Sequence, residues 1–294
     1  MINHKDFSTP VSELIHKRYS CRTYKEQALS PSDITQLQAF SDKCQTGRFG
    51  SDLRFKIAAA SEEDSTSLKN LGTYGFIKNP TGFVIGAITD QPLSLEDIGY
   101  QMELIILRAT DLGIGTCWLG GTFTKSRFTQ VMDLTKSETI PCVVSLGYPA
   151  DQKGWMDRAS RIYAGADRRH PWQDLFFSDS FAQSLSPAQA SQYKNILENV
   201  RLAPSASNRQ PWRILKQGQD LHFYLKRTKK YPPPFFDFLL GLADLQRIDM
   251  GIAMAHFELS AREAGLKGTW TRSEPELNLE NPELEFIATW TSEP

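Results

Sequence analysis

The strongest periodic pattern in the first half of the chain covers residues 95–112. Apolar side chains recur there at steps of four, three, four and three residues, at Ile98, Met102, Ile105, Ala109 and Leu112. This spacing puts them on one face of an α-helix, and Gly113 directly afterwards is typical of a helix C-terminal cap. We therefore expect one long helix here with a single apolar stripe.

Shorter elements are predicted on both sides of this helix. Residues 11–16 have helical spacing. A second helix is expected from Pro31 to about residue 43, because Ser30 suits the N-cap, proline suits the first helical position and Asp33 suits the positive end of the helix. Apolar, partly β-branched runs predict strands at residues 53–60, 82–88, 142–146, 212–215, 221–225 and 284–291.

The pattern of the first half returns in the second half. Residues 185–187, Leu-Ser-Pro, repeat residues 29–31 at an offset of 156 and predict a helix up to residue 202. The apolar stripe returns at an offset of 152, at Met250, Met254, Phe257, Ala261 and Ala264. Coincidence between two amphipathic helices is the alternative, but the stripes, the glycines that end them and the tryptophans that follow (Trp118 and Trp270) agree together. We expect an α+β chain that contains two copies of one unit, residues 10–177 and 185–294.

Composition and charge exclude several classes of function. The 294 residues carry 33 basic and 34 acidic side chains, a net charge of −1, which argues against non-specific binding of nucleic acid. No apolar run approaches the roughly 20 residues of a membrane helix, and the first residues have no apolar core of signal-peptide length. The four cysteines lie far apart, without metal-ligand spacing. We expect a reduced, cytoplasmic protein with no nucleic-acid partner, no membrane partner and no metal site.

Two polar segments are candidates for a binding site. Residues 203–212 read Ala-Pro-Ser-Ala-Ser-Asn-Arg-Gln-Pro-Trp, and Pro204 ends the preceding helical pattern. Because serine, asparagine and proline favour turns for local reasons, an ordinary connector between a helix and a strand is the alternative. Residues 18–22 read Arg-Tyr-Ser-Cys-Arg.

Together the two segments resemble the signatures of the FMN-dependent nitroreductase family, an R-x-S-x-R segment near the N-terminus and an APS-x-x-N-x-QPW loop. The family resemblance implies an α+β fold, usually a homodimer whose FMN sits at the interface between R-x-S-x-R of one subunit and the loop of the other. Here each signature occurs once, one in each half, and residues 44–53 and 176–181 lack them. The resemblance therefore implies a single chain that imitates the dimer, with one complete flavin site and one degenerate site. Such a chain is able to act as a monomer, since its main interface is internal.

The resemblance also implies which residues hold the cofactor. Arg18 and Ser20, with Tyr19 between them, are expected at the phosphate or ribityl end, and Arg169 adds a second cation there. Arg22 is expected near the pyrimidine edge of the flavin ring, where a cation stabilises negative charge; a salt bridge on the first helix is the alternative. The remaining expected contacts are backbone or small groups near the ring, from Leu119, Gly120, Gly121, Pro204, Ser205, Ala206 and Asn208.

Other residues are given lesser roles. Gln210, Pro211 and Trp212 are expected to hold the loop in shape, and residues 73–75 and 78 lie in a region that can contact flavin in relatives. Arg158 and Arg161 are interpreted as surface charges. Residues 229–236 are interpreted as a rigid connector that covers one side of the pocket.

The function that the resemblance implies is a flavin oxidoreductase. NADH or NADPH would reduce FMN, leave, and be replaced by a small-molecule acceptor such as a nitroaromatic or a quinone. No amino-acid nucleophile or acid–base pair is expected to be catalytic, because the cofactor carries the electrons. The alternatives are a flavin-binding sensor or storage protein without turnover, and a pseudoenzyme with an empty site.

Overall fold

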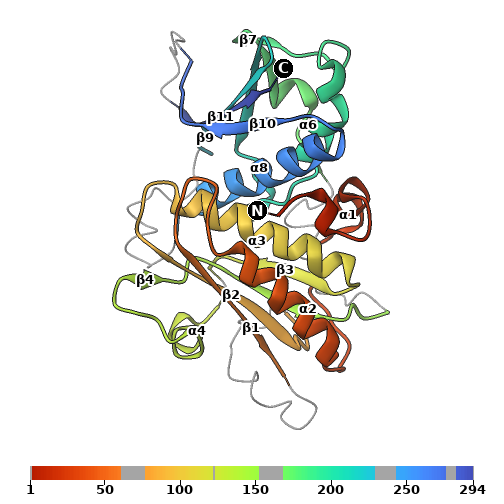
Figure 1. Ribbon diagram of the computed structural model, residues 1–294, viewed down its shortest axis with the longest axis vertical. Helices are drawn as coiled ribbons and strands as arrows, with labels where there is room; N and C mark the ends of the chain where they lie inside the picture. Colours follow the sequence, from red (N-terminus) through yellow and green to blue (C-terminus); the bar gives the residue numbers. More distant parts are fainter. Residues whose placement is uncertain are drawn as a thin grey trace.

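Two long helices, α3 (Ser94–Asp111) and α8 (Leu245–Glu263), lie against each other at the centre of the molecule, with a β-sheet beyond each of them (Figure 1). The computed structural model describes residues 2–60, 77–121, 123–151, 168–228, 243–275 and 283–293. Within these ranges, none of the helices combines the length and the apolar character that a membrane span requires.

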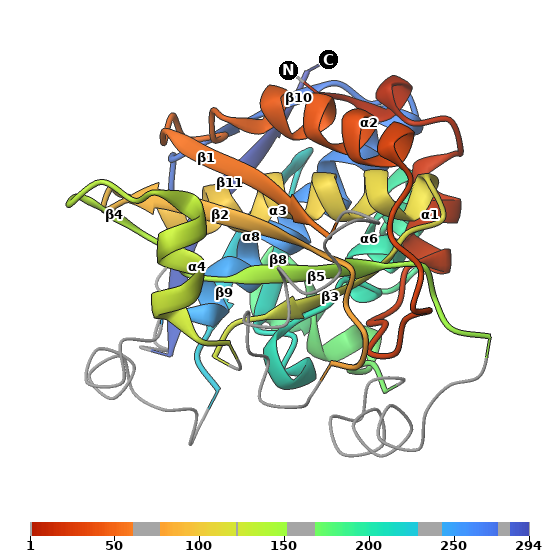
Figure 2. The ribbon, with the colours of Figure 1, turned by 90° about the horizontal axis from the view of Figure 1, so that it is seen from below.

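The first sheet has the strand order β1 (Leu53–Ala59), β2 (Gly82–Thr89), β5 (Val143–Gly147) and β3 (Gly115–Leu119), and all neighbours are antiparallel. The short strand β4 (Glu138–Thr139) also pairs with β2. Helices α2 (Pro31–Ser41) and α3 lie on one face, and α4 (Lys125–Met132) covers the other (Figure 2). Strand β2 is therefore buried on both faces.

The second sheet has the order β10 (Gly268–Thr271), β11 (Leu284–Ser292), β9 (Asp220–Lys226), β8 (Trp212–Gln217), β6 (Phe176–Ser178) and β7 (Ser180–Ser184). Its part β8-β9-β11-β10 matches β1-β2-β5-β3 of the first sheet, with the same antiparallel pairing at each step. Strand β6 adds to β8 in parallel.

Smaller helices complete the described part of the chain. Helices α1 (Val11–Lys17) and α6 (Lys194–Arg201) pack against α8. Single 3₁₀ turns occur at η1 (His4–Asp6), η2 (Asp42–Cys44), η3 (Trp172–Asp174), η4 (Ser191–Tyr193) and η5 (Ala206–Asn208).

The predicted elements agree with most of this architecture. Ser30 caps α2, since its Oγ accepts a 3.0 Å hydrogen bond from the backbone N–H of Asp33. The helix predicted after residue 187 begins later, because residues 187–190 form turns before η4 and α6. Strands β3, β6, β7 and β10 and helix α4 were not predicted. Strand β6, at the expected end of the first half, belongs to the second sheet.

Glycines allow α3 and α8 to cross at backbone contact. A Cβ atom on Gly99 would overlap the backbone oxygen of Ile248, and a Cβ atom on Gly251 would overlap that of Glu96. The two glycines stand 152 residues apart in the sequence, as do Glu96 and Ile248. The contact is therefore reciprocal, as at an interface between two equivalent surfaces.

The close crossing also explains why α3 is more deeply buried than one apolar stripe predicts. The helix has the first sheet on one side and α8 on the other, so its polar residues Asp97 and Glu103 are as buried as the stripe. Buried polar groups need partners, and these come from the elements packed around the helix.

Replacing Gly251 by alanine is expected to lower the free energy of unfolding by at least about 3 kcal/mol, the upper end of the usual cost of overpacking. The helices must separate to admit the new methyl group, and this outweighs the gain of about 1 kcal/mol in helix propensity. Urea denaturation measures the difference. Gly218→Ala is the control, because Gly218 has open space around it and only a positive φ of 56°, which costs about 1 kcal/mol. Equal losses in the two variants would contradict the close approach.

Candidate functional site

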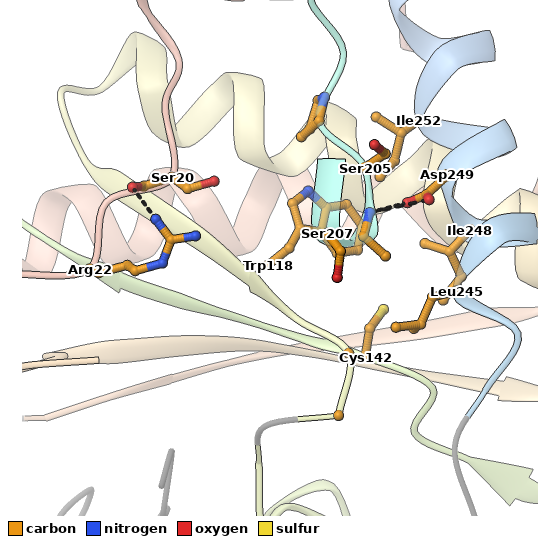
Figure 3. Close-up of a pocket in the computed structure, with 14 residues that line it drawn as sticks. Ser20, Arg22, Trp118, Cys142, Ser205, Ser207, Leu245, Ile248, Asp249 and Ile252 are labelled. Atoms are coloured by element: carbon orange, nitrogen blue, oxygen red, sulfur yellow. Dashed lines mark hydrogen bonds between the residues drawn. The ribbon is translucent and has the colours of Figure 1, made fainter. Parts of the chain in front are cut away.

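A cavity of about 260 Å³ lies where α8 begins, beside the first sheet. Four separate segments line it, at residues 20–22, 118–121, 204–207 and 245–252, with Cys142 at one side. Figure 3 shows Ser20 and Arg22 on one side of the cavity and Leu245, Ile248 and Ile252 of α8 on the other. The cavity thus has a polar, cationic end and an apolar wall.

The cavity brings together seven of the expected site residues: Ser20, Arg22, Gly120, Gly121, Pro204, Ser205 and Ala206. The other five do not line it. Leu119 is buried in the core around α4, and Tyr19 packs against that core. The side chain of Arg18 is 6% exposed, and its Nε lies 3.7 Å from Oε1 of Glu103.

Arg169 and Asn208 lie together beside the loop at residues 203–212. Arg169 Nη1 donates to Asn208 Oδ1 at 3.1 Å, and Nη2 donates to the carbonyl oxygen of Leu202 at 3.2 Å. Asn208 Nδ2 donates to the carbonyl oxygen of Arg168 at 2.7 Å. These bonds connect the loop to residues 168–169.

Gln210 and Trp212 are buried under the loop, as predicted for residues that hold its shape. Gln210 Oε1 accepts a 2.8 Å hydrogen bond from the N–H of His170, and Gln210 Nε2 donates to the carbonyl oxygen of Asn208 at 3.0 Å. Lys78 bonds to Arg22 through its backbone N–H at 2.8 Å and does not line the cavity. The predictions for residues 73–75, 158, 161 and 229–236 lie outside the described residues.

The loop has an unusual backbone that its neighbours hold in place. Ser207, Asn208 and Gln210 have φ values of 49°, 55° and 48°, which side-chain-bearing residues rarely adopt. Such residues persist only where the surrounding structure enforces them, and they concentrate at functional sites. Here the Oγ of Ser205 accepts a 2.9 Å bond from the N–H of Gln210 across the turn.

Asp249 is a site residue that the motifs did not reveal. It lines the cavity, and its carboxylate accepts bonds of 2.9 and 3.1 Å from the backbone N–H of Ala206. Burial raises the pKa of Asp249 well above its ordinary value, the bond from Ala206 opposes this, and the negative charge of Asp244 adds to it. Asp97 precedes the first apolar stripe as Asp249 precedes the second, and it likewise holds a loop, through the N–H groups of Phe49 and Ser51. The recurrence of aspartate at an offset of 152 residues is the feature of the sequence that could have revealed Asp249.

Two further lining residues limit what the cavity can do. Burial raises the pKa of the Cys142 thiol to about 12, so at neutral pH this group is not a thiolate nucleophile. A Cβ atom on Gly120 would lie 2.5 Å from Cδ1 of Leu245. Glycine at this position therefore lets the segment at residues 118–121 lie close to the start of α8. Among the described residues, no group of three or more His, Cys, Asp or Glu side chains is placed to hold a metal ion.

The comparisons with known proteins identify the family of the chain. A family described as "Putative TM nitroreductase" matches residues 10–261. The chain belongs to this nitroreductase family. Membership confirms the family that the two sequence segments resemble.

The individual proteins that this chain resembles have low sequence identity to it. A protein of Archaeoglobus fulgidus named "Putative NADH dehydrogenase/NAD(P)H nitroreductase" is 25% identical over 170 residues, 54% of this chain and 97% of that protein. The crystal structure of a "putative nitroreductase" from Thermotoga maritima covers 99% of this chain and 95% of its own, with a TM-score of 0.60 at 19% identity. An "FMN-dependent Nitroreductase" of Clostridium difficile covers 48% of this chain and 88% of its own, with a TM-score of 0.39 at 19% identity. The Thermotoga structure shows that the α+β fold is that of a nitroreductase.

The Asp249→Asn variant is expected to change how stability depends on pH. A carboxyl group whose pKa is raised by folding binds its proton more tightly in the native state, so its contribution falls as pH rises from about 4 toward the folded pKa. Asparagine still accepts the Ala206 N–H and has no such proton. Between about pH 4 and pH 7 the variant should gain stability relative to the wild type with rising pH, by up to about 1.4 kcal/mol per unit.

Urea denaturation at several pH values measures this gain. The exposed Glu26, changed to glutamine, is the matched control and should leave the pH dependence nearly unchanged. Parallel pH profiles for Asp249→Asn and the wild type would show that Asp249 does not retain a proton on folding.

Proposed function

We propose that this protein is an FMN-dependent oxidoreductase that takes hydride from NADH or NADPH and passes it to a nitroaromatic, a quinone or a similar small acceptor. The observation that carries the proposal is the cavity, which unites residues 20–22 with residues 204–206 from parts of the chain more than 180 residues apart. Membership of the nitroreductase family supports the class of reaction, and the name of the Archaeoglobus relative supports the reductant.

The residues around the cavity fit the parts of FMN. A polar ribityl chain needs hydroxyl partners and the edge of the ring needs a cation, and Ser20 and Arg22 supply these on one side of the cavity. A flat ring needs a wall without obstructing side chains, and Gly120 and Gly121 supply that. The apolar residues of α8 face this wall and exclude water.

Bound FMN would supply the chemistry, accepting hydride from the nicotinamide and returning the electrons to the acceptor. The role of the protein's own residues is to bind and orient the cofactor. Ser205 accepts the N–H of Gln210, which leaves its own hydroxyl hydrogen to donate toward a ligand. The N–H of Ala206 bonds to Asp249 and so packs the loop without serving as a donor to the cofactor. Arg22 stabilises negative charge at the ring edge.

We also propose that residues 10–177 and 185–294 are two copies of one unit and that together they act as a monomer. The matching strand orders, the reciprocal glycines and the paired roles of Asp97 and Asp249 support this. The Archaeoglobus relative, nearly whole, matches only about half of the chain, which is consistent with it.

One site per chain follows from the residues at corresponding positions. The apolar Ile248 and Ile252 correspond, 152 residues earlier, to Glu96 and Tyr100. Glu96 is buried and paired with Arg247 at 2.6 Å, and Tyr100 donates to Glu258 at 2.7 Å. Gly120 corresponds to Arg272. At the place in the other half that corresponds to the cavity, charged and polar side chains thus stand where the cavity has its apolar wall and a glycine.

The purified protein is expected to bind about one FMN per chain and to lose its visible flavin absorbance when NADH or NADPH is added without oxygen. Absorbance spectra and a titration of the apoprotein with FMN measure both. Two FMN per chain would contradict the single site. Bound flavin that neither nucleotide reduces would favour a flavin sensor or storage protein, and no uptake of FMN would overturn the proposal.

Arg22→Gln is expected to make the reduction potential of bound FMN more negative by about 30 mV or more, because it removes a cation near the reduced ring; 30 mV corresponds to about 1.4 kcal/mol for a two-electron couple. The reduction potential of Arg22→Lys should stay close to that of the wild type, because lysine keeps the positive charge. Spectroelectrochemistry measures it. Arg209→Gln is the matched control, since Arg209 is exposed on the loop at residues 203–212 and outside the cavity lining. An unchanged reduction potential in Arg22→Gln would show that Arg22 does not lie at the ring edge.

A further inference from the structure

Three ionisable side chains stand in the described lining of the cavity: Arg22, Cys142 and Asp249. Asp249 is 3% exposed, and Figure 3 shows its carboxyl group on the α8 side of the cavity, bonded to the loop at residues 203–212. Arg22 lies across the cavity from it. Asp249 therefore brings a carboxyl group to the wall of a cavity that is otherwise apolar on this side.

The surroundings of Asp249 favour the protonated, neutral form of its carboxyl group. A buried carboxylate is stable only where a cation or several hydrogen-bond donors compensate its charge. The two oxygens of Asp249 share one described donor, the backbone N–H of Ala206, at 2.9 and 3.1 Å. Burial raises the pKa of Asp249, and the nearby charge of Asp244, which is also negative, raises it further. Asp249 thus keeps a proton at the cavity wall.

Reduction of a quinone requires a proton in addition to a hydride. The hydride brings two electrons and one hydrogen, which convert the quinone into the anion of a hydroquinone, and this anion then takes a proton on oxygen. A phenolic oxygen has an ordinary pKa of about 10. The Cys142 thiol, with a pKa of about 12, is a weaker acid than a phenol, and the guanidinium of Arg22 is weaker still. A carboxyl group is ordinarily the stronger acid, so Asp249 is the lining residue suited to supply the proton.

We propose that Asp249 is the catalytic acid that protonates a quinone acceptor in this cavity. This inference rests on the proposed function. The quinone receives a hydride from the reduced cofactor, while the O–H bond of Asp249 breaks and a new O–H bond forms on the quinone oxygen. The products are a neutral hydroquinone and the Asp249 carboxylate, which takes a proton from water before the next turnover. Ile248 and Ile252 flank Asp249 in the cavity lining and suit the apolar ring of such an acceptor.

Asp249→Asn removes the proton and keeps the shape of the site, because the side-chain oxygen of asparagine still accepts the N–H of Ala206. Asp97→Asn is the matched control. Asp97 is also buried and holds a loop, through the N–H groups of Phe49 and Ser51, but it lies outside the cavity lining. The wild type and both variants, loaded with FMN, are reduced with dithionite without oxygen. They are then mixed with the quinone menadione, or with ferricyanide, which takes electrons without a proton, and the return of flavin absorbance is followed.

Menadione should reoxidise Asp249→Asn at least about tenfold more slowly than the wild type, whereas the rate with ferricyanide should stay within about twofold. Asp97→Asn should match the wild type with both acceptors. An unchanged rate with menadione in Asp249→Asn would overturn the proposal. Equal losses with menadione and ferricyanide, or the same loss in Asp97→Asn, would indicate a merely structural effect and would also overturn it.

Infrared spectroscopy of the apoproteins tests the proton without the cofactor. At neutral pH the difference spectrum between the wild type and Asp249→Asn should contain the C=O stretching band of a protonated carboxyl group. Absence of this band would overturn the proposal. If the wild type takes up no FMN, or if neither NADH nor NADPH reduces the bound FMN, the proposed function fails. The infrared band then still supports or overturns the proton on Asp249, so the two failures are distinguishable.

Discussion

The crossing of α3 and α8 at Gly99 and Gly251 is the constraint on which the rest of the structure depends. Because neither glycine has a Cβ atom, each backbone reaches a carbonyl oxygen of the other helix. Both helices are then enclosed on almost every side, and every polar group they carry near the crossing must find a partner inside the protein. The candidate site lies at the edge of this crossing, since Ile248 and Asp249, three and two residues before Gly251, line the cavity.

Buried polar groups on the two helices therefore shape the loops above them. Asp249 bonds to Ala206 and Asp97 bonds to Phe49 and Ser51, so a carboxylate on each helix holds a loop that reaches across. A loop whose backbone includes three residues with positive φ would not keep that shape by itself. The same enclosure places Glu103 Oε1 within 3.0 Å of His256 Nε2. The two helices thus hold in place the loops that pack against them.

The sequence predicted those features that depend on local chemistry. Ser30 and Pro31 start α2, and the apolar stripes lie on α3 and α8. The meeting of residues 20–22 with residues 204–206 in one cavity was implied by the family resemblance and not by local chemistry. Features that depend on long-range packing were not predictable. Strand β7 is short and mostly exposed, so it has no apolar alternation. Arg169 bonds to Asn208, and only the folded chain brings these residues together. Asp249 repeats Asp97 at an offset of 152 residues, but the spacing did not show that its partner is the backbone N–H of Ala206.

The two ends of the crossing differ in chemistry although they share geometry. At one end Ile248 and Ile252, each only 2% exposed, form an apolar wall of the cavity. At the other end Glu96, Tyr100 and their partners Arg247 and Glu258 satisfy one another within the protein. Such a group contributes to a fixed interface without any ligand. In the proposed duplication, a single chain can therefore keep one open site and close the other, which a homodimer of identical subunits cannot do, since any substitution there changes both sites.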